Sequence, residues 1–370
     1  MVLQLEEALV VDEIHVPGYE KIVRIRHEEV GLDAIISIHS LTLGPSLGGT
    51  RIYPYPSFGA ALNDVLRLSL GMTYKSAIAR CGWGGGKSVI IADPKKDKSA
   101  ELLHAFGLAV DRMRGSYICA EDVGSSPQDM VAIRQVTPYV VGLSHEKSSG
   151  NPSPYTAWGT FRGIQAALKW QCGSESVKGK TIAIQGMGSV GSRLAEMLFW
   201  QGAKLIISDV RLENCQPIAK MTGAQIVSPQ DILKVPCDVL APCALGGIIQ
   251  HDMIPFLQCG IVAGAANNQL QADGDAEQLK ERGILYAPDF VINAGGLINV
   301  SQELELAGYD PIAVRSKIEG IYDQLLSIFE IADQKNCSTH AAAIALGNEC
   351  LKNAAYKRTI DPCFHHAPTP

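Results

Sequence analysis

Two lysines stand on either side of a glycine-rich segment in the first quarter of the chain. The segment GWGGG at 82–86 precedes Lys87 and an apolar run at 88–92, which predicts a buried strand. The glycines predict a loop whose backbone approaches a ligand closely. A lysine held there loses hydration, so its pKa falls and it can act as a general base near neutral pH. Lys75 lies near the end of a predicted helix at 60–79 and could bind a substrate carboxylate; a solvated surface charge is the alternative for each lysine.

An acidic pair follows the next predicted strand. Glu121 and Asp122 come directly after the apolar run at 116–120. In α/β sheets, ligands bind at the carboxyl ends of the strands. Asp122 is therefore a candidate proton carrier, and an aspartate that caps a helix or a turn is the alternative reading.

The clearest motif is GMGSVG at 186–191, which lies between a predicted strand and a predicted helix. In dinucleotide-binding folds the first glycine of such a motif, here Gly186, permits the tight turn. The second, Gly188, lets the backbone reach the pyrophosphate, and the third, Gly191, lets helix and strand pack closely. The cofactor phosphates would then face the free N–H groups at the start of the helix, around Ser189 and Val190.

An acidic residue follows this motif at the spacing of a ribose-binding group. Asp209 ends the next predicted strand, 23 residues after Gly186. A carboxylate at this point accepts hydrogen bonds from the adenosine ribose and repels a 2′-phosphate. The sequence therefore predicts NAD as the cofactor. Arg211 could tolerate a 2′-phosphate, which leaves some use of NADP open.

Strands and helices alternate along the chain, and this order would place the candidate groups at the ends of neighbouring strands. The alternation predicts an α/β fold with a parallel, doubly wound sheet. Predicted strands cover 34–39, 88–92, 116–120, 181–185, 204–209, 239–241, 261–263, 284–286 and 290–293, and predicted helices cover 60–79, 99–114, 155–171, 190–201, 311–335 and 338–353.

The position of the dinucleotide motif predicts the order of two domains. Because the motif begins only after residue 180, we expect a Rossmann-type NAD-binding domain over 146–337. The substrate domain should then cover 1–145 together with about 338–370. The segment SSGNPSP at 148–154 concentrates turn-forming residues and predicts a hinge or loop near the boundary.

Composition excludes several classes of protein. The 370 residues are 46% hydrophobic with a net charge of −6, so the chain should be globular and should not bind nucleic acid. The acidic N-terminus and the lack of a long apolar run predict neither a secretory signal nor a membrane span. Ten cysteines occur without CxxC spacing, which predicts reduced, buried thiols in a cytoplasmic protein and no metal site.

Beyond these single features, nearly the whole chain resembles the Glu/Leu/Phe/Val dehydrogenase family, and in particular its leucine (branched-chain amino acid) dehydrogenase branch. The segments that carry the resemblance are LGPSLGGTR (43–51), GMTYKSA (71–77), GGGKSVIIADP (84–94), AEDVGSS (120–126), SSGNPSP (148–154), GMGSVG (186–191), AGAANNQL (263–270) and NAGGLINV (293–300).

The resemblance implies a reaction and a role for three residues. It implies reversible oxidative deamination, in which an L-amino acid, NAD⁺ and water give a 2-oxo acid, ammonia and NADH. By similarity, Lys75 binds the substrate carboxylate and Lys87 activates the water that attacks an imine intermediate. Asp122 shuttles protons to and from the nitrogen.

The resemblance also implies which other residues contact substrate and cofactor. Four apolar positions would form the side-chain pocket, which disfavours glutamate and favours leucine, isoleucine and valine. The implied substrate-binding residues are Leu43, Gly48, Gly49, Ala120, Asn268, Leu297 and Val300, of which Leu43, Ala120, Leu297 and Val300 form this pocket. The implied cofactor-binding residues are Thr156, Gly186, Gly188, Ser189, Val190, Gly191, Asp209 and Asn267.

Two alternatives to this function stay open. Trp83 departs from the family pattern close to Lys87, so phenylalanine or tryptophan is a second candidate substrate. A catalytically silent NAD-binding paralogue is a third interpretation, although such a protein has no reason to keep Lys75, Lys87 and Asp122 together. The resemblance further implies a homo-oligomer, an octamer or a dimer, built through the first domain and the C-terminal segment.

Overall fold

The chain divides into two compact units in the computed structural model, which describes residues 2–143 and 148–364. The first unit comprises 1–151, 299–311 and 350–370, and the second comprises 152–298 and 312–349.

These units differ from the predicted domain ranges in three segments, of which 146–151 falls in the first unit and not in the second. The segment 299–311 belongs to the first unit because Glu303 binds the backbone of Gly142 and Ser149 there. Conversely, 338–349 belongs to the second unit. Its start is held by a hydrogen bond from Ser338 N to Glu277 Oε1 of 3.0 Å and by one from the Thr339 hydroxyl to a backbone carbonyl. The helical patterns in the sequence do not predict to which unit either segment belongs, because the contacts that hold each segment join residues far apart in sequence.

The first unit is built on a mixed six-stranded sheet of order β1-β2-β3-β5-β4-β6 among the described residues. The pairs β1–β2, β2–β3 and β3–β5 are antiparallel, whereas β4 is parallel to both β5 and β6. Its strands are β1 (Val10–Glu13), β2 (Lys21–His27), β3 (Leu32–Ser40), β4 (Ser46–Tyr53), β5 (Gly84–Ile91) and β6 (Tyr117–Glu121). This unit is therefore α/β, as predicted, but the parallel arrangement suggested by the alternation of strands and helices does not extend to all of its sheet. The short β2–β3 connection, which includes Gly31 at φ 67°, can join only antiparallel strands.

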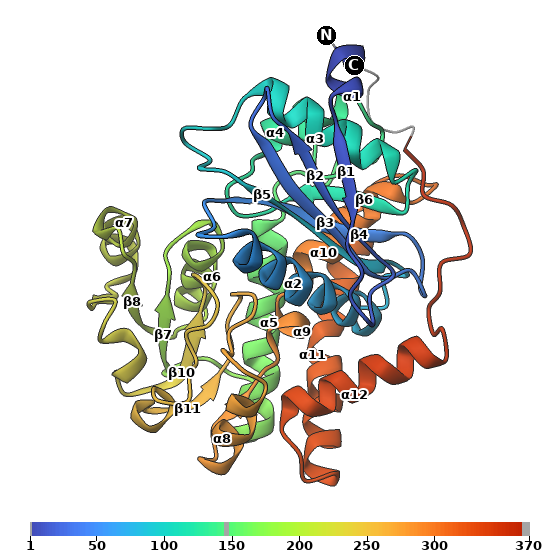
Figure 1. The fold of residues 1–370 in the computed structure, drawn as a ribbon. Helices are drawn as coiled ribbons and strands as arrows, with labels where there is room; N and C mark the ends of the chain where they lie inside the picture. The colour runs from blue at the N-terminus through green and yellow to red at the C-terminus, as the bar shows by residue number, and fades with distance from the viewer. Residues whose placement is uncertain (1, 144–147, 365–370) are drawn as a thin grey trace. The chain divides into compact units, whose positions relative to one another are not determined.

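Helices cover both faces of this sheet (Figure 1). One face packs Ile35 and Val89 against Val65 of the long helix α2, and the alternate residues Ile36 and Ile90 pack with α3 and α4 on the other face. The helices of the unit are α1 (Val2–Glu7), α2 (Phe58–Ile78), α3 (Ala100–Arg112) and α4 (Pro127–Arg134), with a 3₁₀ turn, η3 (Gln302–Leu304). The alternation of buried residues along β3 and β5 follows from the two-residue period of a strand.

The glycine-rich segment forms part of a strand, which corrects the predicted loop. β5 begins at Gly84, so Lys87 sits inside the sheet. A Cβ atom on Gly85 would lie 1.9 Å from Oγ1 of Thr73 in α2, and one on Gly86 would lie 2.7 Å from Oγ of Ser46. The glycines therefore let α2 and β4 approach β5 closely.

The second unit contains a parallel sheet of order β12-β11-β10-β7-β8-β9 in the described part of the chain. Its strands are β7 (Thr181–Gln185), β8 (Lys204–Ser208), β9 (Gln225–Ile226), β10 (Cys237–Pro242), β11 (Cys259–Val262) and β12 (Leu285–Tyr286). Counted along the chain, this is the 3-2-1-4-5-6 arrangement of a doubly wound dinucleotide-binding fold, with the order reversing between β7 and β10. The predicted Rossmann-type domain is confirmed.

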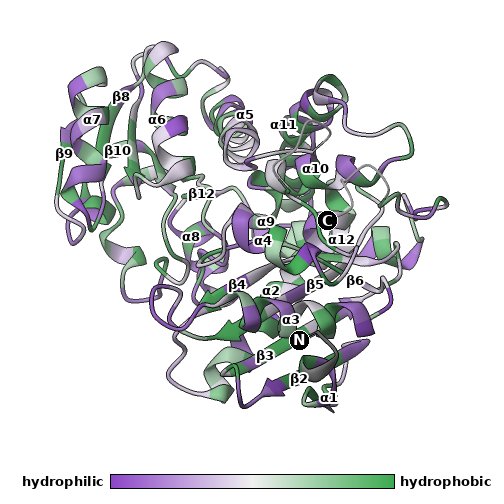
Figure 2. Ribbon diagram, turned by 90° about the horizontal axis from the view of Figure 1, so that it is seen from above, coloured by the Kyte–Doolittle hydropathy of each residue, from purple (hydrophilic) through white to green (hydrophobic). Residues whose placement is uncertain are grey.

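The helices of the second unit are α5 (Ser153–Cys172), α6 (Ser189–Trp200), α7 (Leu212–Thr222), α8 (Gly274–Glu281), α9 (Asp289–Ile292), α10 (Gly295–Ser301), α11 (Pro311–Gln334) and α12 (Thr339–Lys352), with 3₁₀ turns η1 (Ile232–Lys234) and η2 (Ile254–Phe256); α10, α11 and α12 cross the boundaries between the units. Four of these helices, α5, α6, α11 and α12, match expected spans, whereas α7, α8, α9 and α10 were not predicted as helices. Figure 2 shows both hydrophilic and hydrophobic stretches along α6 and α7, as expected of helices with one buried face.

Two expectations for this part of the chain need revision. The predicted strand at 290–293 is the short helix α9, because Pro288 and Asp289 start a helical turn; Asp289 Oδ1 accepts a hydrogen bond from Phe290 N at 2.6 Å. The predicted loop over 148–154 ends at Pro152, since α5 begins at Ser153. Across the described residues, no helix is long and apolar enough to cross a membrane. The cytoplasmic location stays a prediction.

The buried carboxylate of Glu303 binds the backbone near the end of 1–151, the first segment of unit 1. Glu303 is 7% exposed, and its oxygens accept hydrogen bonds from Gly142 N at 3.1 Å and from Ser149 N at 2.7 Å, as well as from the Ser149 hydroxyl. Asn299 adds a bond from Nδ2 to Ser149 O of 3.1 Å. Burial raises the pKa of Glu303, although the hydrogen bonds from Ser149 and Gly142 oppose this shift. Glu303 therefore holds both ends of the segment 142–149.

Replacing Glu303 by alanine should destabilise the protein by about 2–4 kcal/mol, because three buried donors lose their charged acceptor. Urea denaturation at matched protein concentration measures this loss. Glu303→Gln keeps one acceptor oxygen and should lose less. Glu29→Ala, an exposed acid in the β2–β3 turn, is the surface control and should stay within about 0.5 kcal/mol of the parent protein. Equal stability of Glu303→Ala and the parent would contradict the assigned role.

Candidate active site

Lys87 and Asp122 form a buried ion pair on one face of the first sheet. Lys87 Nζ lies 3.0 Å from Asp122 Oδ1, and the two side chains are 5% and 14% exposed. Lys87 projects from β5, and Asp122 directly follows the end of β6. Asp122 is held in place by a hydrogen bond of 2.8 Å from its backbone N to Ser125 Oγ. The two predicted catalytic residues are thus in contact.

The absent side chain of Gly49 makes room for this pair. Gly49 lies in β4, the strand between β5 and β6. A Cβ atom on Gly49 would lie 2.8 Å from Asp122 Cβ, 2.8 Å from Glu121 O and 3.1 Å from Lys87 Nζ. Its neighbour Gly48 has a different function, because a Cβ atom there would lie 1.8 Å from the carbonyl oxygen of Gly86. Gly49 therefore admits the charged pair, and Gly48 admits the adjoining backbone.

Arg51 is the charged residue that the sequence analysis missed. Its Nε lies 2.9 Å from Asp122 Oδ2, and its Nη1 lies 2.9 Å from Asp64 Oδ2 in α2. The Tyr55 hydroxyl donates a further hydrogen bond to Asp64. Arg51 is two residues beyond Gly49 on the same strand, so the two-residue period of a strand could have placed both on one face.

Burial and neighbouring charges shift the pKa values of this cluster. Burial lowers the pKa of Lys87; Asp122 acts against this shift, and Arg51 adds to it. Burial alone would raise the pKa of Asp122, but Lys87 and Arg51 outweigh it and hold the carboxyl ionised well below its usual range. In the absence of ligand, the cluster therefore offers a lysine that loses its proton more easily than usual beside an ionised carboxylate.

The other predicted substrate residues of the first unit are also buried. Lys75 occupies the last turn of α2 and is 9% exposed. Ala120 lies in β6, Val300 lies in α10, and Leu43 precedes β4. The Leu43 carbonyl accepts a hydrogen bond of 2.8 Å from Arg358 N.

Trp83 is fully buried and contacts the C-terminal segment. The Arg358 guanidinium lies 4.2 Å from the centre of its indole ring, and Ser76 binds its backbone N and O. Arg358 in turn pairs with Glu305 at 3.1 Å. Trp83 is therefore fixed by packing within the first unit.

In the second unit, the predicted cofactor motif lies at the carboxyl end of β7. Gly186 has φ 97°, a conformation that favours glycine, and a Cβ atom on Gly191 would lie 1.9 Å from Gly186 O. Gly188 differs, because no atom lies within 4 Å of a Cβ placed there. It precedes α6, which receives no side-chain cap. The start of α6, at Ser189 and Val190, therefore presents N–H groups beside open space, which fits a phosphate-bearing cofactor.

Asp209 lies beside this turn, directly after β8. Its carboxylate accepts hydrogen bonds from Met187 N at 2.7 Å, from Arg211 N at 2.9 Å and from Asn214 Nδ2 at 3.2 Å. These bonds fix the carboxylate against the glycine-rich turn. The side chain of Arg211 is exposed.

Two further glycine clusters bring loops of the second unit together. A Cβ atom on Gly246 would lie 2.3 Å from Asn267 O, and Asn268 takes a left-handed conformation with φ 50°. Asn293 Nδ2 donates to Asn267 Oδ1 at 2.7 Å. Similarly, a Cβ atom on Gly296 would lie 2.7 Å from Thr156 Oγ1, close to Leu297. The backbones of these loops therefore approach each other closely at both glycines.

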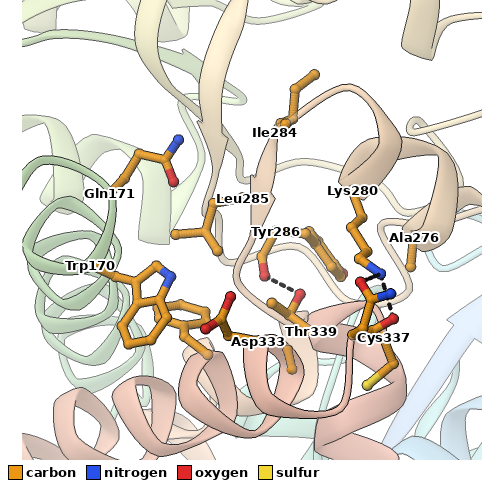
Figure 3. Close-up of a pocket in the computed structure, with 14 residues that line it drawn as sticks. Trp170, Gln171, Ala276, Lys280, Ile284, Leu285, Tyr286, Asp333, Cys337 and Thr339 are labelled. Carbon is orange, nitrogen blue, oxygen red and sulfur yellow. Dashed lines mark hydrogen bonds between the residues drawn. The ribbon is translucent and has the colours of Figure 1, made fainter.

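A cavity of about 340 Å³ elsewhere in the second unit contains none of the predicted site residues (Figure 3). Its lining includes Trp170, Leu285, Asp333 and Thr339. Lys280, at its edge, donates to Oδ1 of Asn336 at 2.9 Å. The position of this cavity therefore does not identify the active site.

The ten cysteines all lie within the described residues and are free thiols. Cys119 and Cys215 are buried, Cys172 is exposed, and the others are intermediate, so the expectation of buried thiols holds for only part of the set. Within 2–143 and 148–364, no group of three or more His, Cys, Asp or Glu side chains could hold a metal ion.

Comparison with known proteins adds independent evidence. Family models match two parts of the chain: residues 20–139 match the Glu/Leu/Phe/Val dehydrogenase dimerisation domain, and residues 207–359 match the Glutamate/Leucine/Phenylalanine/Valine dehydrogenase model. Leucine dehydrogenase from Thermoactinomyces intermedius is 48% identical over 335 residues, which cover 90% of this chain and 91% of that protein. L-tryptophan dehydrogenase from Nostoc punctiforme is 45% identical over 338 residues, which cover 91% and 94%.

A solved structure agrees with these matches. The crystal structure of L-tryptophan dehydrogenase from Nostoc punctiforme aligns with a TM-score of 0.76 at 43% identity and covers 91% of this chain and 96% of that chain. Both units of the chain therefore have counterparts in dehydrogenases that act on amino acids. The chain belongs to the Glu/Leu/Phe/Val dehydrogenase family and is an amino acid dehydrogenase.

Proposed function

We propose that the protein catalyses the reversible, NAD-dependent oxidative deamination of an L-amino acid with an apolar side chain, with leucine, isoleucine and valine preferred. The buried contact between Lys87 and Asp122 carries this proposal, because it pairs a lysine of lowered pKa with a carboxylate that is ionised before substrate enters and is free to accept a proton from it. Proton transfer to and from a substrate nitrogen and an attacking water needs both kinds of group.

Each charged residue of the first sheet takes a distinct part in this scheme. The Lys87 amine accepts a proton from the attacking water, and Asp122 exchanges protons with the substrate nitrogen. Arg51 holds the second oxygen of Asp122, which leaves the first oxygen directed at Lys87. Lys75 supplies the positive charge that binds the substrate carboxylate.

The second unit supports NAD as the cofactor. NAD⁺, when bound, accepts a hydride from the α-carbon of the substrate. The N–H groups at the start of α6 would hold its phosphates, and Asp209 would receive the ribose hydroxyls and repel a 2′-phosphate. Thr156, Asn267 and Asn268 complete the proposed contacts.

The proposed side-chain pocket is apolar at every position. Leu43, Ala120, Leu297 and Val300 are each at most 7% exposed and carry no charge. The similarity to leucine dehydrogenases supports branched-chain substrates. A tryptophan or phenylalanine substrate is the second candidate, favoured by the similarity to L-tryptophan dehydrogenase and by the unusual Trp83.

The match to a dimerisation domain supports a homo-oligomer, either a dimer or an octamer.

NADH formation with a panel of L-amino acids at alkaline pH tests this function. We expect turnover with leucine, isoleucine and valine, higher with NAD⁺ than with NADP⁺. Lys87→Ala should lower kcat by about 10²–10⁴-fold, the usual contribution of a general base, while NAD⁺ binding stays intact. Higher activity with phenylalanine or tryptophan would select the second candidate. A protein that binds NAD⁺ but turns over none of these amino acids would rule out both.

The space beside Gly49 gives a second prediction. Gly49→Ala places a methyl group against Asp122 and should lower kcat by about 100-fold, because a small displacement of a catalytic group has effects of that size. Gly71→Ala is the matched control, since it lies in α2 with no atom within 4 Å of the new Cβ. The control should retain full activity. Wild-type kcat in Gly49→Ala would show that the carboxylate position is not critical.

The charge on Arg51 gives a prediction about pH. Because Lys87 has a lowered pKa, the deamination rate should rise with pH through an inflection below that of an ordinary lysine. Arg51 contributes to this lowering, so Arg51→Gln should move the inflection to higher pH, whereas Arg51→Lys should largely retain it. The pH profile of kcat/KM measures both variants. An inflection at lower pH in Arg51→Gln would contradict the assigned electrostatic role.

A further inference from the structure

Two cysteines lie side by side at the amino ends of neighbouring strands in the second unit. Cys237 begins β10 and Cys259 begins β11, and the two residues are direct partners in the parallel register. Both side chains are partly exposed, and both pack at the edge of the apolar core formed by residues such as Ile232, Leu240 and Val262. Their position in the sheet fixes the distance between their backbones.

That distance suits a covalent link. Neighbouring strands lie about 4.8 Å apart. A disulfide joins Cα atoms that are typically about 4.4–6.8 Å apart. The pair can therefore be joined with little movement of the sheet.

The surroundings make one thiol the stronger nucleophile. A hydrogen bond from Cys237 lowers the pKa of Cys259; burial opposes this shift, and the positive charge of Arg282 adds to it. The hydrogen bond to Cys259 and burial raise the pKa of Cys237, and the charge of Asp238 adds to this. Thiolates react with oxidants whereas thiols do not, so Cys259 should react first and Cys237 should resolve the product.

We propose that Cys237 and Cys259 form a redox-active dithiol that peroxides convert into an intrachain disulfide. The Cys259 thiolate attacks one oxygen of hydrogen peroxide, and after protonation this gives a sulfenic acid and one water molecule. Cys237 then attacks the Cys259 sulfur, so the S–S bond forms as the S–O bond breaks and a second water molecule leaves. In total, two thiols and one peroxide give one disulfide and two waters, and a dithiol reductant reverses the change.

Cys237 and Cys259 lie at the opposite end of the sheet from the residues proposed to bind the cofactor. The cysteines lie at the amino ends of β10 and β11, whereas Gly186, Asp209 and Asn267 lie at the carboxyl ends of strands in the same sheet. Cys243 follows the carboxyl end of β10, and burial raises the pKa of its thiol to about 12. Cys243 is thus a nearby cysteine that should not react.

Peptide mapping of the full chain after treatment with hydrogen peroxide tests the proposal. Trypsin leaves both cysteines on one peptide, because no Lys or Arg lies between Lys234 and Lys280. Cleavage before aspartate places Cys237, Cys243 and Cys259 on the separate peptides 231–237, 238–251 and 252–272. We expect a peptide of 231–237 linked to 252–272, a loss of two free thiols per chain, and recovery of both with dithiothreitol.

Single variants assign the link. Cys237→Ser and Cys259→Ser should each abolish it, whereas Cys243→Ser should leave its yield unchanged. The wild-type map decides the matter even if a variant folds poorly. Free Cys237 and Cys259 after peroxide treatment, a link through Cys243, or irreversible oxidation without a link would overturn the proposal. None of these results depends on the substrate or cofactor of the enzyme.

Discussion

The ion pair between Lys87 and Asp122 is the interaction on which the arrangement of the first unit depends. Two opposite charges buried 3.0 Å apart are stable only if the surrounding groups satisfy them and leave them room. Gly49 supplies the room, and Arg51 satisfies the second carboxylate oxygen. Because β4 runs between β5 and β6, Gly49 lies next to both charged residues.

The site at which we propose that the cofactor phosphates bind, in the second unit, is formed differently. It combines an uncapped helix start at Ser189, an open position at Gly188 and a carboxylate fixed by backbone N–H groups. These three features depend on local backbone geometry, which explains why the residues that form them occur at a regular spacing in the sequence.

This difference decides how much could be predicted from the sequence. The elements around Gly186 and Asp209 follow local rules of spacing, and the parallel, doubly wound character of the second sheet was predicted correctly. In the first unit, the glycines at 84–86 were expected to form a loop. They lie in a strand instead, where α2 and β4 occupy the space that their side chains would take, and these elements are distant in sequence. Arg51 was missed for the same reason: its partners Asp64 and Asp122 come from other elements. The short apolar run at 290–293 fits a strand or a helix equally well, and only the contacts of Asp289 favour the helix.

The cluster around Lys87 also has a consequence for the charge of whatever enters it. Asp64, Arg51, Asp122 and Lys87 alternate in sign, so their formal charges sum to zero while Lys87 is protonated. When Lys87 gives up its proton, the cluster becomes a buried monoanion. A buried anion favours a cation beside it, and a neutral cluster does not. The protonation state of one lysine therefore selects whether a ligand nitrogen is received as an ammonium or as a neutral amine, before any bond to it changes.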